Sequence, residues 1–254
     1  MSALWWKPSG VSEIAPAPVP LQLLILDCDG VLIDSEPPSN RLIAMDLRAR
    51  GLALSDDQAR QRFSGKSLSM IAAELAAEDG LVLPPDWPAR TQVLLVAMLE
   101  QEAALIDGAR EMLEAVAALG LPVRVASNSS HAEMAVKFRR TGLERMLTGR
   151  LHSAQDVARP KPWPDLFLSA AAAEGVDPAA CLVVEDSDTG LRAALEAGMA
   201  CVVLRPEGEH RHDHAAIAAR PAAVSWIRHL QALEPILTEA MRSGDRAVIP
   251  ETGS

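Results

Sequence analysis

Two aspartates one residue apart, Asp27 and Asp29, are the residues of this sequence best suited to chemistry. They directly follow a continuous apolar segment, which places them at the end of a buried strand, where two carboxylates can converge on one small space. A carboxylate is already ionised at neutral pH and can attack phosphorus without a base. A second carboxylate can protonate the leaving oxygen and then deprotonate a water. Asp27 is therefore a candidate nucleophile and Asp29 a candidate acid and base.

The tetrapeptide from Asp27 to Gly30 has two other interpretations. Taken alone, an Asp-x-Asp-Gly sequence is usually a solvated turn. A calcium loop needs glycine at its sixth position and glutamate at its twelfth, whereas here glycine is fourth and the twelfth residue is Pro38. The buried strand before Asp27 and three polar clusters later in the chain favour the catalytic interpretation.

The three later clusters could supply a phosphate-binding site, a positive charge and a cation-binding site. Ser127 and Asn128 end a second apolar segment, where a hydroxyl and backbone amides at a helix start can hold phosphate; an ordinary N-cap is the alternative. Lys161 lies between prolines, which suits a positioned charge for a phosphoryl oxygen; a surface loop is the alternative. Glu185 and Asp186 follow another buried strand, where paired acids are costly unless they bind a cation.

A cation is required because an attacking carboxylate and a phosphate repel each other. Asp186 stands at the turn after its strand, which makes it the better direct metal ligand of the pair. Glu185 either binds the metal directly or acts through a water. The chemistry of these clusters thus calls for a divalent metal held by carboxylates.

Four apolar segments are predicted as strands of a parallel sheet. Helical patterns lie between them, and two of these helices stop at Gly142 and Gly198, where a left-handed C-cap is favoured. This alternation predicts a doubly wound, Rossmann-like α/β core, with ligands at the carboxyl ends of its strands. The predicted strands are 21–26, 122–126, 181–184 and 200–204.

The interval 37–106 interrupts this alternation. It contains no convincing strand, and its apolar spacing is helical in four segments, so we predict an inserted all-helical cap. The α/β catalytic core then comprises 21–36 and 107–254, after an N-terminal extension at 1–20. Within the core, residues 223–241 are predicted as one amphipathic helix. The cap helices are predicted at 37–50, 55–63, 67–78 and 88–105.

Together, these motifs resemble those of the haloacid dehalogenase superfamily in type, order and spacing, over about residues 21–206. The insert resembles the cap of the branch that contains β-phosphoglucomutase, phosphoglycolate phosphatase and sugar-phosphate phosphatases. The resemblance implies that Asp27, the main-chain carbonyl of Asp29 and Asp186 hold Mg²⁺. It also implies that Ser127 and Lys161 grip the phosphoryl group. The motifs are Leu26–Glu36, Ser127–Asn128, Lys161–Pro162 and Glu185–Gly190.

The implied activity is Mg²⁺-dependent hydrolysis of a small phosphate monoester through an aspartyl-phosphate on Asp27. The expected partner is a small phosphorylated metabolite: a sugar, sugar-acid or polyol phosphate. Dehalogenases lack an aspartate at the position of Asp29, and mutases carry a histidine where Ser39 stands, so both positions favour phosphate hydrolysis. A phosphosugar mutase is the alternative, as is a catalytically silent binding module, against which the intact acids and Lys161 argue.

Lys66 is a candidate specificity residue. It lies in a break between two cap helices, and in the cap branch that the chain resembles the corresponding loop faces the active site. Its ammonium would then meet a carboxylate or hydroxyl of the leaving group. The alternative is a solvated lysine in a turn.

The bulk composition limits the remaining partners and the location. The formal net charge is −10 and no Lys/Arg run occurs, so nucleic acid and acidic membranes are poor partners. Three cysteines without paired spacing and no apolar run of membrane-spanning length predict a cytoplasmic protein. The oligomeric state has no signature in the sequence. His210, His212 and His214 form a possible transition-metal cluster, although a solvated loop is the simpler interpretation.

Overall fold

The structure, a computed structural model, describes residues 19–63, 66–205 and 223–242. Most of the predicted N-terminal extension lies outside these residues, as does the loop with His210, His212 and His214. In the described part of the chain, no helix has both the length and the apolar character that a membrane crossing requires.

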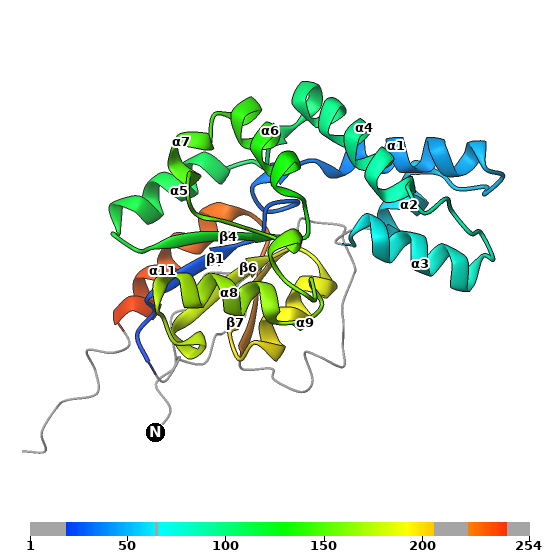
Figure 1. Cartoon of the computed structure of the whole chain (residues 1–254). Coiled ribbons are helices and arrows are strands. Elements are labelled where there is room, and N and C mark those ends of the chain that lie inside the picture. The colour runs from blue at the N-terminus through cyan, green and yellow to red at the C-terminus, as the bar shows by residue number, and fades with distance from the viewer. Residues whose placement is uncertain (1–18, 64–65, 206–222, 243–254) are drawn as a thin grey trace, which may run out of the picture.

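A six-stranded parallel sheet forms the centre of the molecule (Figure 1). Its strands are β1 (Leu23–Leu26), β4 (Val123–Ser127), β5 (Leu151–Ser153), β6 (Cys181–Glu185), β7 (Ala200–Leu204) and β8 (Val224–Ile227). Their order across the sheet is β5-β4-β1-β6-β7-β8. The chain first fills the β4 side of β1 and then crosses to the β6 side, so the strand order reverses at β1. A crevice opens at such a reversal, at the carboxyl ends of the strands.

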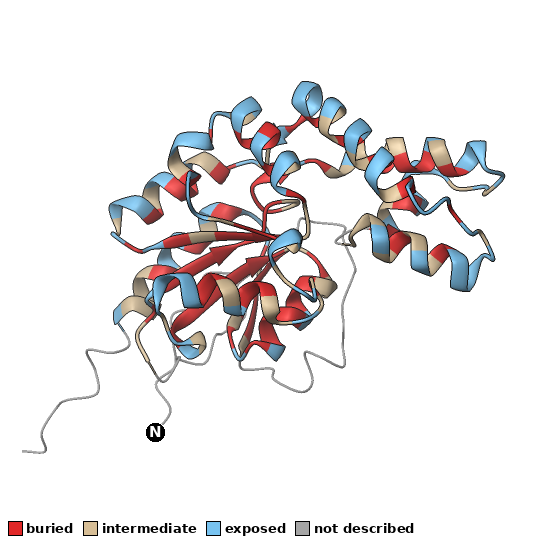
Figure 2. Ribbon diagram, viewed as in Figure 1, coloured by how far each residue is buried: buried red, intermediate tan, exposed pale blue. Residues whose placement is uncertain are grey.

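Strand β1 is buried on both faces, which explains its continuous apolar sequence. Leu23 and Ile25 contribute to one apolar cluster, whereas Leu24 and Leu26 contribute to the cluster on the opposite face. Successive side chains of a strand point to opposite faces, so a strand covered on both sides needs an apolar residue at every position. Figure 2 shows the resulting band of buried residues along the sheet.

Helices cover both faces of the sheet. Helices that contribute buried residues to the cluster of Leu24 and Leu26 include α5 (Ala109–Ala118), α6 (His131–Thr141), α7 (Glu144–Leu147) and α11 (Leu233–Arg242). Leu95 and Leu99, from a helix of the inserted segment, also join this cluster. The helices that cover the other face are α8 (Asp165–Glu174) and α9 (Asp188–Glu196). These layers confirm the predicted doubly wound α/β fold.

Four further helices stand beside the sheet, at the right of Figure 1; they pack on one another, and the last of them also packs on α6. They enclose an apolar cluster of their own that includes Leu47, Phe63 and Leu75. This separate cluster is the physical basis of the inserted helical cap, while the domain limits at residues 36 and 107 stay a prediction. The helices are α1 (Glu36–Ala49), α2 (Asp56–Phe63), α3 (Leu68–Glu78) and α4 (Trp87–Glu102).

Three local predictions were wrong. Residues 223–241 do not form one helix: β8 pairs with β7, a short 3₁₀ turn follows, and α11 begins at Leu233. Strand β5 was missed because three residues are too short to show a period. The predicted helix at 88–105 ends at Glu102, since β3 (Ala104–Leu105) pairs with β2 (Ile33–Asp34) in a two-stranded antiparallel ribbon.

Candidate active site

Asp27, directly after β1, shares a buried ammonium group with Glu185, the last residue of β6. Lys161 Nζ lies 2.6 Å from Asp27 Oδ1 and 2.6 Å from Glu185 Oε1. The three side chains are 9%, 1% and 2% exposed for Asp27, Glu185 and Lys161, respectively. The ammonium also lies 4.6 Å from the centre of the Phe167 ring. Because buried charges are costly without partners, these groups hold one another in place.

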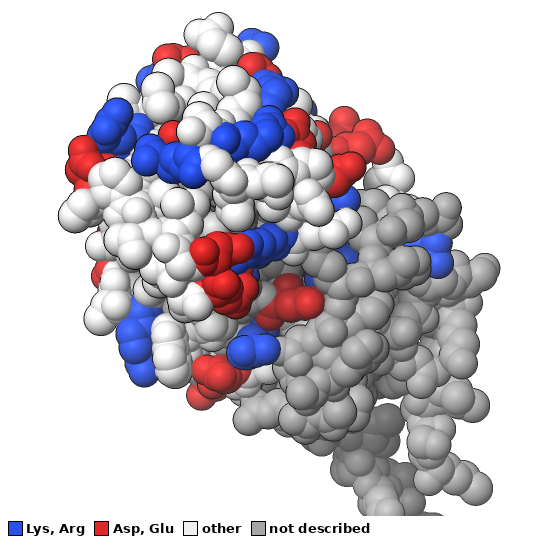
Figure 3. Space-filling view, turned by 90° about the vertical axis from the view of Figure 1, so that its right-hand side faces the viewer, with Lys and Arg blue, Asp and Glu red and all other residues white. Residues whose placement is uncertain are grey.

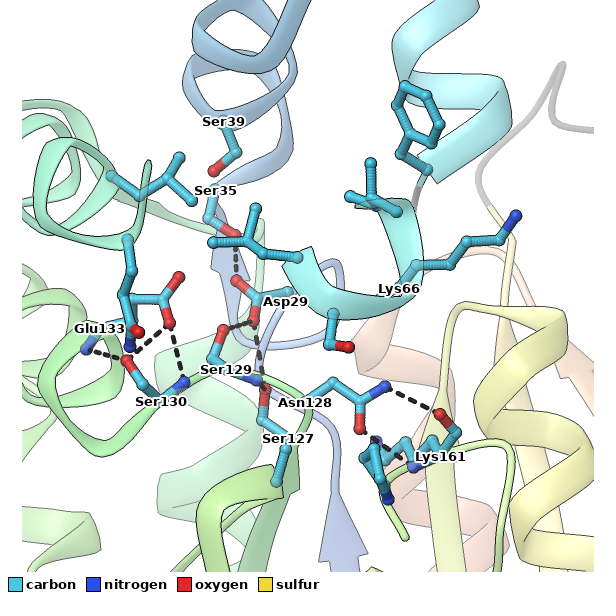
Figure 4. Close-up of a pocket in the computed structure, with 18 of the residues that line it drawn as sticks. Asp29, Ser35, Ser39, Lys66, Ser127, Asn128, Ser129, Ser130, Glu133 and Lys161 are labelled. Atoms are coloured by element: carbon cyan, nitrogen blue, oxygen red, sulfur yellow. Dashed lines mark hydrogen bonds between the residues drawn. The ribbon is translucent and has the colours of Figure 1, made fainter. Parts of the chain in front are cut away.

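The side chain of Asn128 fixes the backbone of Lys161. Its Oδ1 accepts from the Lys161 amide and its Nδ2 donates to the Lys161 carbonyl, each at 3.1 Å (Figure 4). The sequence predicted Asn128 as a phosphate-binding residue. The structure adds a positioning role, since both ends of this side-chain amide contact Lys161, and phosphate binding by Asn128 stays a prediction.

Asp29 is the centre of a second hydrogen-bond network, which is separate from the contacts of Lys161 (Figure 4). Its carboxylate accepts from the Ser127 hydroxyl at 3.2 Å and from the Ser129 hydroxyl at 2.7 Å. It also accepts from the hydroxyl of Ser35, which precedes α1. The side chain predicted as the acid and base thus joins the β1 end, the β4 end and the start of the cap.

Lys137 completes this network, although its sequence position did not lead us to predict it as a site residue. Its Nζ lies 2.6 Å from Asp29 Oδ1 and donates to Ser129 Oγ at 2.8 Å. A lysine within a helix is normally solvated, yet this one is only 2% exposed. Met134, Lys137 and Phe138 lie on one face of α6, and all three are buried. Spacing places Lys137 on an apolar helix face but does not show that this face meets the site.

The two aspartates have different proton affinities. Burial raises the pKa of Asp27 to about 7, despite the opposing charge of Lys161. Burial also acts to raise the pKa of Asp29, but the charge of Lys137 and the hydrogen bonds from Lys137, Ser35 and Ser129 outweigh it, and this pKa falls below its usual value. Two neighbouring carboxyl groups with separated pKa values suit two different roles.

Asp27, Glu185 and Asp186 form an acidic cluster in which one oxygen from each lies within 4.8 Å of the others. Burial raises the pKa of Asp186 well above its usual range, and the charges of Glu185 and Asp27 raise it further. Glu185 is positioned by its other oxygen, which accepts from the Ser187 amide at 2.9 Å. Hard oxygen ligands in this arrangement suit a divalent cation, whose charge would relieve their repulsion. The donor set therefore fits the predicted metal.

Two glycines allow this crowding. Gly30 has a φ of +81°, and a Cβ there would lie 2.1 Å from Asp186 Oδ2. A Cβ on Gly190 would lie 1.8 Å from Glu185 Oε1. Both positions exclude any larger residue while the two acids keep their places.

A cavity of about 460 Å³ opens above these groups, lined by the core and by α1, α3 and α4 of the cap. Ser39, Asn40 and Lys66 contribute from the cap side. Lys66 Nζ lies 2.5 Å from Glu74 Oε2, and Figure 4 draws this side chain pointing away from Asp29. Its role in substrate recognition stays a prediction.

Opposite charges are interspersed on the face drawn in Figure 3, without a large patch of one sign on its described part. Inside the cavity, by contrast, Lys137 and Lys161 are buried beside carboxylates. The positive charge that an anionic substrate needs is therefore local to the site.

The fold and this site define a doubly wound α/β protein with a helical cap and an acidic centre where the strand order reverses. The chain belongs to the haloacid dehalogenase-like hydrolase family, whose model matches residues 21–198.

Proteins of known activity agree with this assignment. The chain is 30% identical over 180 residues to 6-phosphogluconate phosphatase of Escherichia coli K12, covering 70% of this chain and 80% of that protein. It is 30% identical over 210 residues to hexitol phosphatase B of the same organism, with 76% and 88% covered. A solved family hydrolase from Deinococcus radiodurans, with bound phosphate and sodium, superposes with a TM-score of 0.68 at 32% identity, covering 87% of this chain and 96% of that one. The chain is a phosphoric monoester hydrolase.

We expect Gly30→Ala to lower activity at least about 10-fold and to raise the metal concentration needed for turnover, because the new methyl group displaces Asp186. Gly175→Ala is the matched control: its φ is +65°, and a Cβ there meets nothing within 4 Å. Both variants carry the strain of a left-handed residue, about 1 kcal/mol. Activity measured as a function of metal concentration distinguishes the two variants. Similar losses of activity in Gly30→Ala and Gly175→Ala would contradict the steric explanation.

Lys137→Met should lower the free energy of unfolding by about 2 kcal/mol, because it removes the charged partner of the Asp29 carboxylate, whose side chain is 27% exposed. Urea denaturation measures this loss. Arg139→Met, on the same helix with a side chain 57% exposed, should change stability by no more than about 0.5 kcal/mol.

The stability difference caused by Lys137→Met should also depend on pH. The folded-state pKa of Asp29 lies below its unfolded value, near 3.8. The stabilisation is therefore complete above that value and is lost as pH falls through the folded-state pKa. The difference in unfolding free energy between wild type and variant should be the same at about pH 7 and about pH 5, and should shrink as the pH falls below about 4. A difference independent of pH would contradict the ion-pair explanation.

Proposed function

We propose that this protein is a Mg²⁺-dependent phosphatase that hydrolyses a phosphorylated sugar, sugar acid or polyol through an aspartyl-phosphate on Asp27. The observation that carries the proposal is the place of Asp27, between the Lys161 ammonium at 2.6 Å and the acidic cluster with Asp186. The two phosphatases to which the chain is similar act, by their names, on 6-phosphogluconate and on hexitol phosphates. Both names support a small phosphorylated metabolite as substrate.

The metal site comprises Asp27, Asp186 and the main-chain carbonyl of Asp29, with Glu185 as a direct or water-mediated ligand. Mg²⁺ bound there would neutralise charge on the phosphoryl oxygens and keep Asp27 ionised. Lys161 then supplies the protein's own positive charge, held in place by Glu185 and Asn128. Ser127 holds the phosphoryl group from the β4 side.

The reaction has two steps that use the same aspartates. A carboxylate oxygen of Asp27 bonds to phosphorus, the ester P–O bond breaks, and the leaving oxygen takes a proton from Asp29, which must therefore be protonated when the substrate is bound. Asp29 then takes a proton from a water that attacks the aspartyl-phosphate, which releases phosphate and restores Asp27. The network around Asp29 supports the second step, because it stabilises the ionised carboxylate that acts as the base.

Simple hydrolysis is favoured over phosphoryl transfer between two positions of a sugar. Ser39 lines the cavity. In the branch that the chain resembles, the mutases carry a histidine at this position. A silent binding module is disfavoured by the intact, mutually positioned acids and lysines. The three free, buried cysteines support a cytoplasmic location.

Asp27→Asn should lower turnover of p-nitrophenyl phosphate by about 10³-fold or more, since an amide cannot form the acyl-phosphate. The loss is measured with pure protein in excess Mg²⁺, after circular dichroism has shown that the variant is folded. Asp165→Asn, which alters a carboxylate that pairs with Arg159 at the start of α8, is the control and should keep wild-type activity. Substantial Mg²⁺-dependent turnover by Asp27→Asn would refute the nucleophile assignment.

EDTA should abolish turnover, and added Mg²⁺ should restore it. Asp186→Asn should raise the Mg²⁺ concentration for half-maximal activity by about 10-fold or more, because one anionic ligand is lost. Asp177→Asn, which changes a cap residue of a short 3₁₀ turn, should leave that concentration unchanged. Full activity in EDTA would exclude the proposed metal site.

A further inference from the structure

The cap side of the cavity is lined mostly by uncharged side chains, and Glu36 and Lys66 are the charged residues in its described part. Ser39 lines it from α1, Ser69 from α3 and Gln92 from α4, alongside apolar side chains such as Ile43 and Leu95. Hydroxyl and amide groups of this kind exchange hydrogen bonds with neutral oxygens. The described wall on this side therefore resembles a binding surface for hydroxyl groups.

Each lysine that lines the described cavity is already paired with a carboxylate. Lys137 lies 2.6 Å from Asp29 and Lys161 lies 2.6 Å from Asp27. On the cap side, Lys66 lies 2.5 Å from Glu74. The described lining includes no arginine. A carboxylate on the leaving group would thus have to displace Glu74 from Lys66 or lose its water without gaining a partner, and both are costly.

Asn40 adds a donor that needs an acceptor. It lines the cavity from α1 and is only 6% exposed. Glu36, Asn40 and Ile43 follow at spacings of four and three residues, so this face of α1 turns to the cavity. The Nδ2 of Asn40 is buried and has no hydrogen-bond partner among the described residues. Buried donors are almost always paired, so this one needs an oxygen that the described residues do not supply, and its place in the cavity lining makes a ligand oxygen a suitable partner.

We propose that the leaving group is a neutral polyhydroxyl chain, without a carboxylate or a second phosphate, and that Asn40 donates a hydrogen bond to one of its oxygens. The inference rests on the proposed phosphatase activity and narrows its substrates from sugars, sugar acids and polyols to the neutral ones. Because the lysines are already paired with carboxylates, a leaving group that carries its own carboxylate or a second phosphate is disfavoured. The amide of Asn40 favours a leaving group with hydroxyl groups.

Two matched substrate pairs test the preference for neutral chains. Glucitol 6-phosphate and 6-phosphogluconate share a carbon chain and differ at one end, where a hydroxymethyl group replaces a carboxylate. Glycerol 3-phosphate and 3-phosphoglycerate differ in the same way. In at least one pair, kcat/KM should be about 10-fold or more higher for the neutral member than for the acid. In neither pair should the acid be the better substrate. Equal values, preference for the acids, or turnover of none of the four would overturn the inference.

Glu74→Gln tests the charge argument by freeing Lys66 inside the folded protein. It should raise kcat/KM for 6-phosphogluconate relative to glucitol 6-phosphate by about 5-fold or more. Glu78→Gln is the matched control, because Glu78 pairs with Arg62 as Glu74 does but has no contact with Lys66. Equal changes in the two variants would show that Glu74 does not exclude anions.

Asn40→Ala tests the hydrogen bond. It should lower kcat/KM for the preferred neutral substrate by about 10-fold and leave p-nitrophenyl phosphate, which has no hydroxyl chain, within about 2-fold. Equal losses on both substrates would mean that Asn40 only supports the fold. Failure of the proposed function itself looks different: wild type would then not hydrolyse p-nitrophenyl phosphate, or Asp27→Asn would still do so.

Discussion

The buried ammonium of Lys161 holds the active site together. It lies between the carboxylates of Asp27 and Glu185, so it connects the ends of β1 and β6 with the loop before α8. None of these charges is stable in the interior alone, because removing one leaves the others without compensation. Asn128 fixes the lysine backbone from the end of β4. A single ion cluster thus specifies how four distant chain segments meet.

A second lysine gives the two neighbouring aspartates different properties. Asp27 shares Lys161 with Glu185 and lies beside Asp186, so its negative charge remains costly and its pKa is raised. Asp29 has Lys137 and three serine hydroxyls as donors, so its negative charge is well stabilised and its pKa is lowered. The two carboxylates are separated by a single residue in the sequence, yet their pKa values differ. The reason is that each lies beside a different buried lysine, Lys161 for Asp27 and Lys137 for Asp29.

The sheet and the acidic motifs could be predicted from the sequence because they depend on local rules. Strands buried on both faces are apolar at every position, and Asp27, Glu185 and Asp186 stand directly at their ends. Lys137 and Asn40 were missed because their roles depend on which face of a helix meets the site, and sequence spacing alone does not show that a polar residue is buried. Strand β8 was missed because its four residues join a helical pattern without a strong break.

The acidic cluster makes metal binding and proton binding competitive. Burial and the mutual repulsion of the acids raise the pKa values of Asp27 and Asp186, so their charged forms are disfavoured when no cation is bound. A divalent ion bound in this cluster would compete with protons, and because it would bind the folded chain it would also shift the folding equilibrium. The melting temperature would then depend jointly on pH and on the concentration of free metal, which would link the stability of the fold to the supply of that metal.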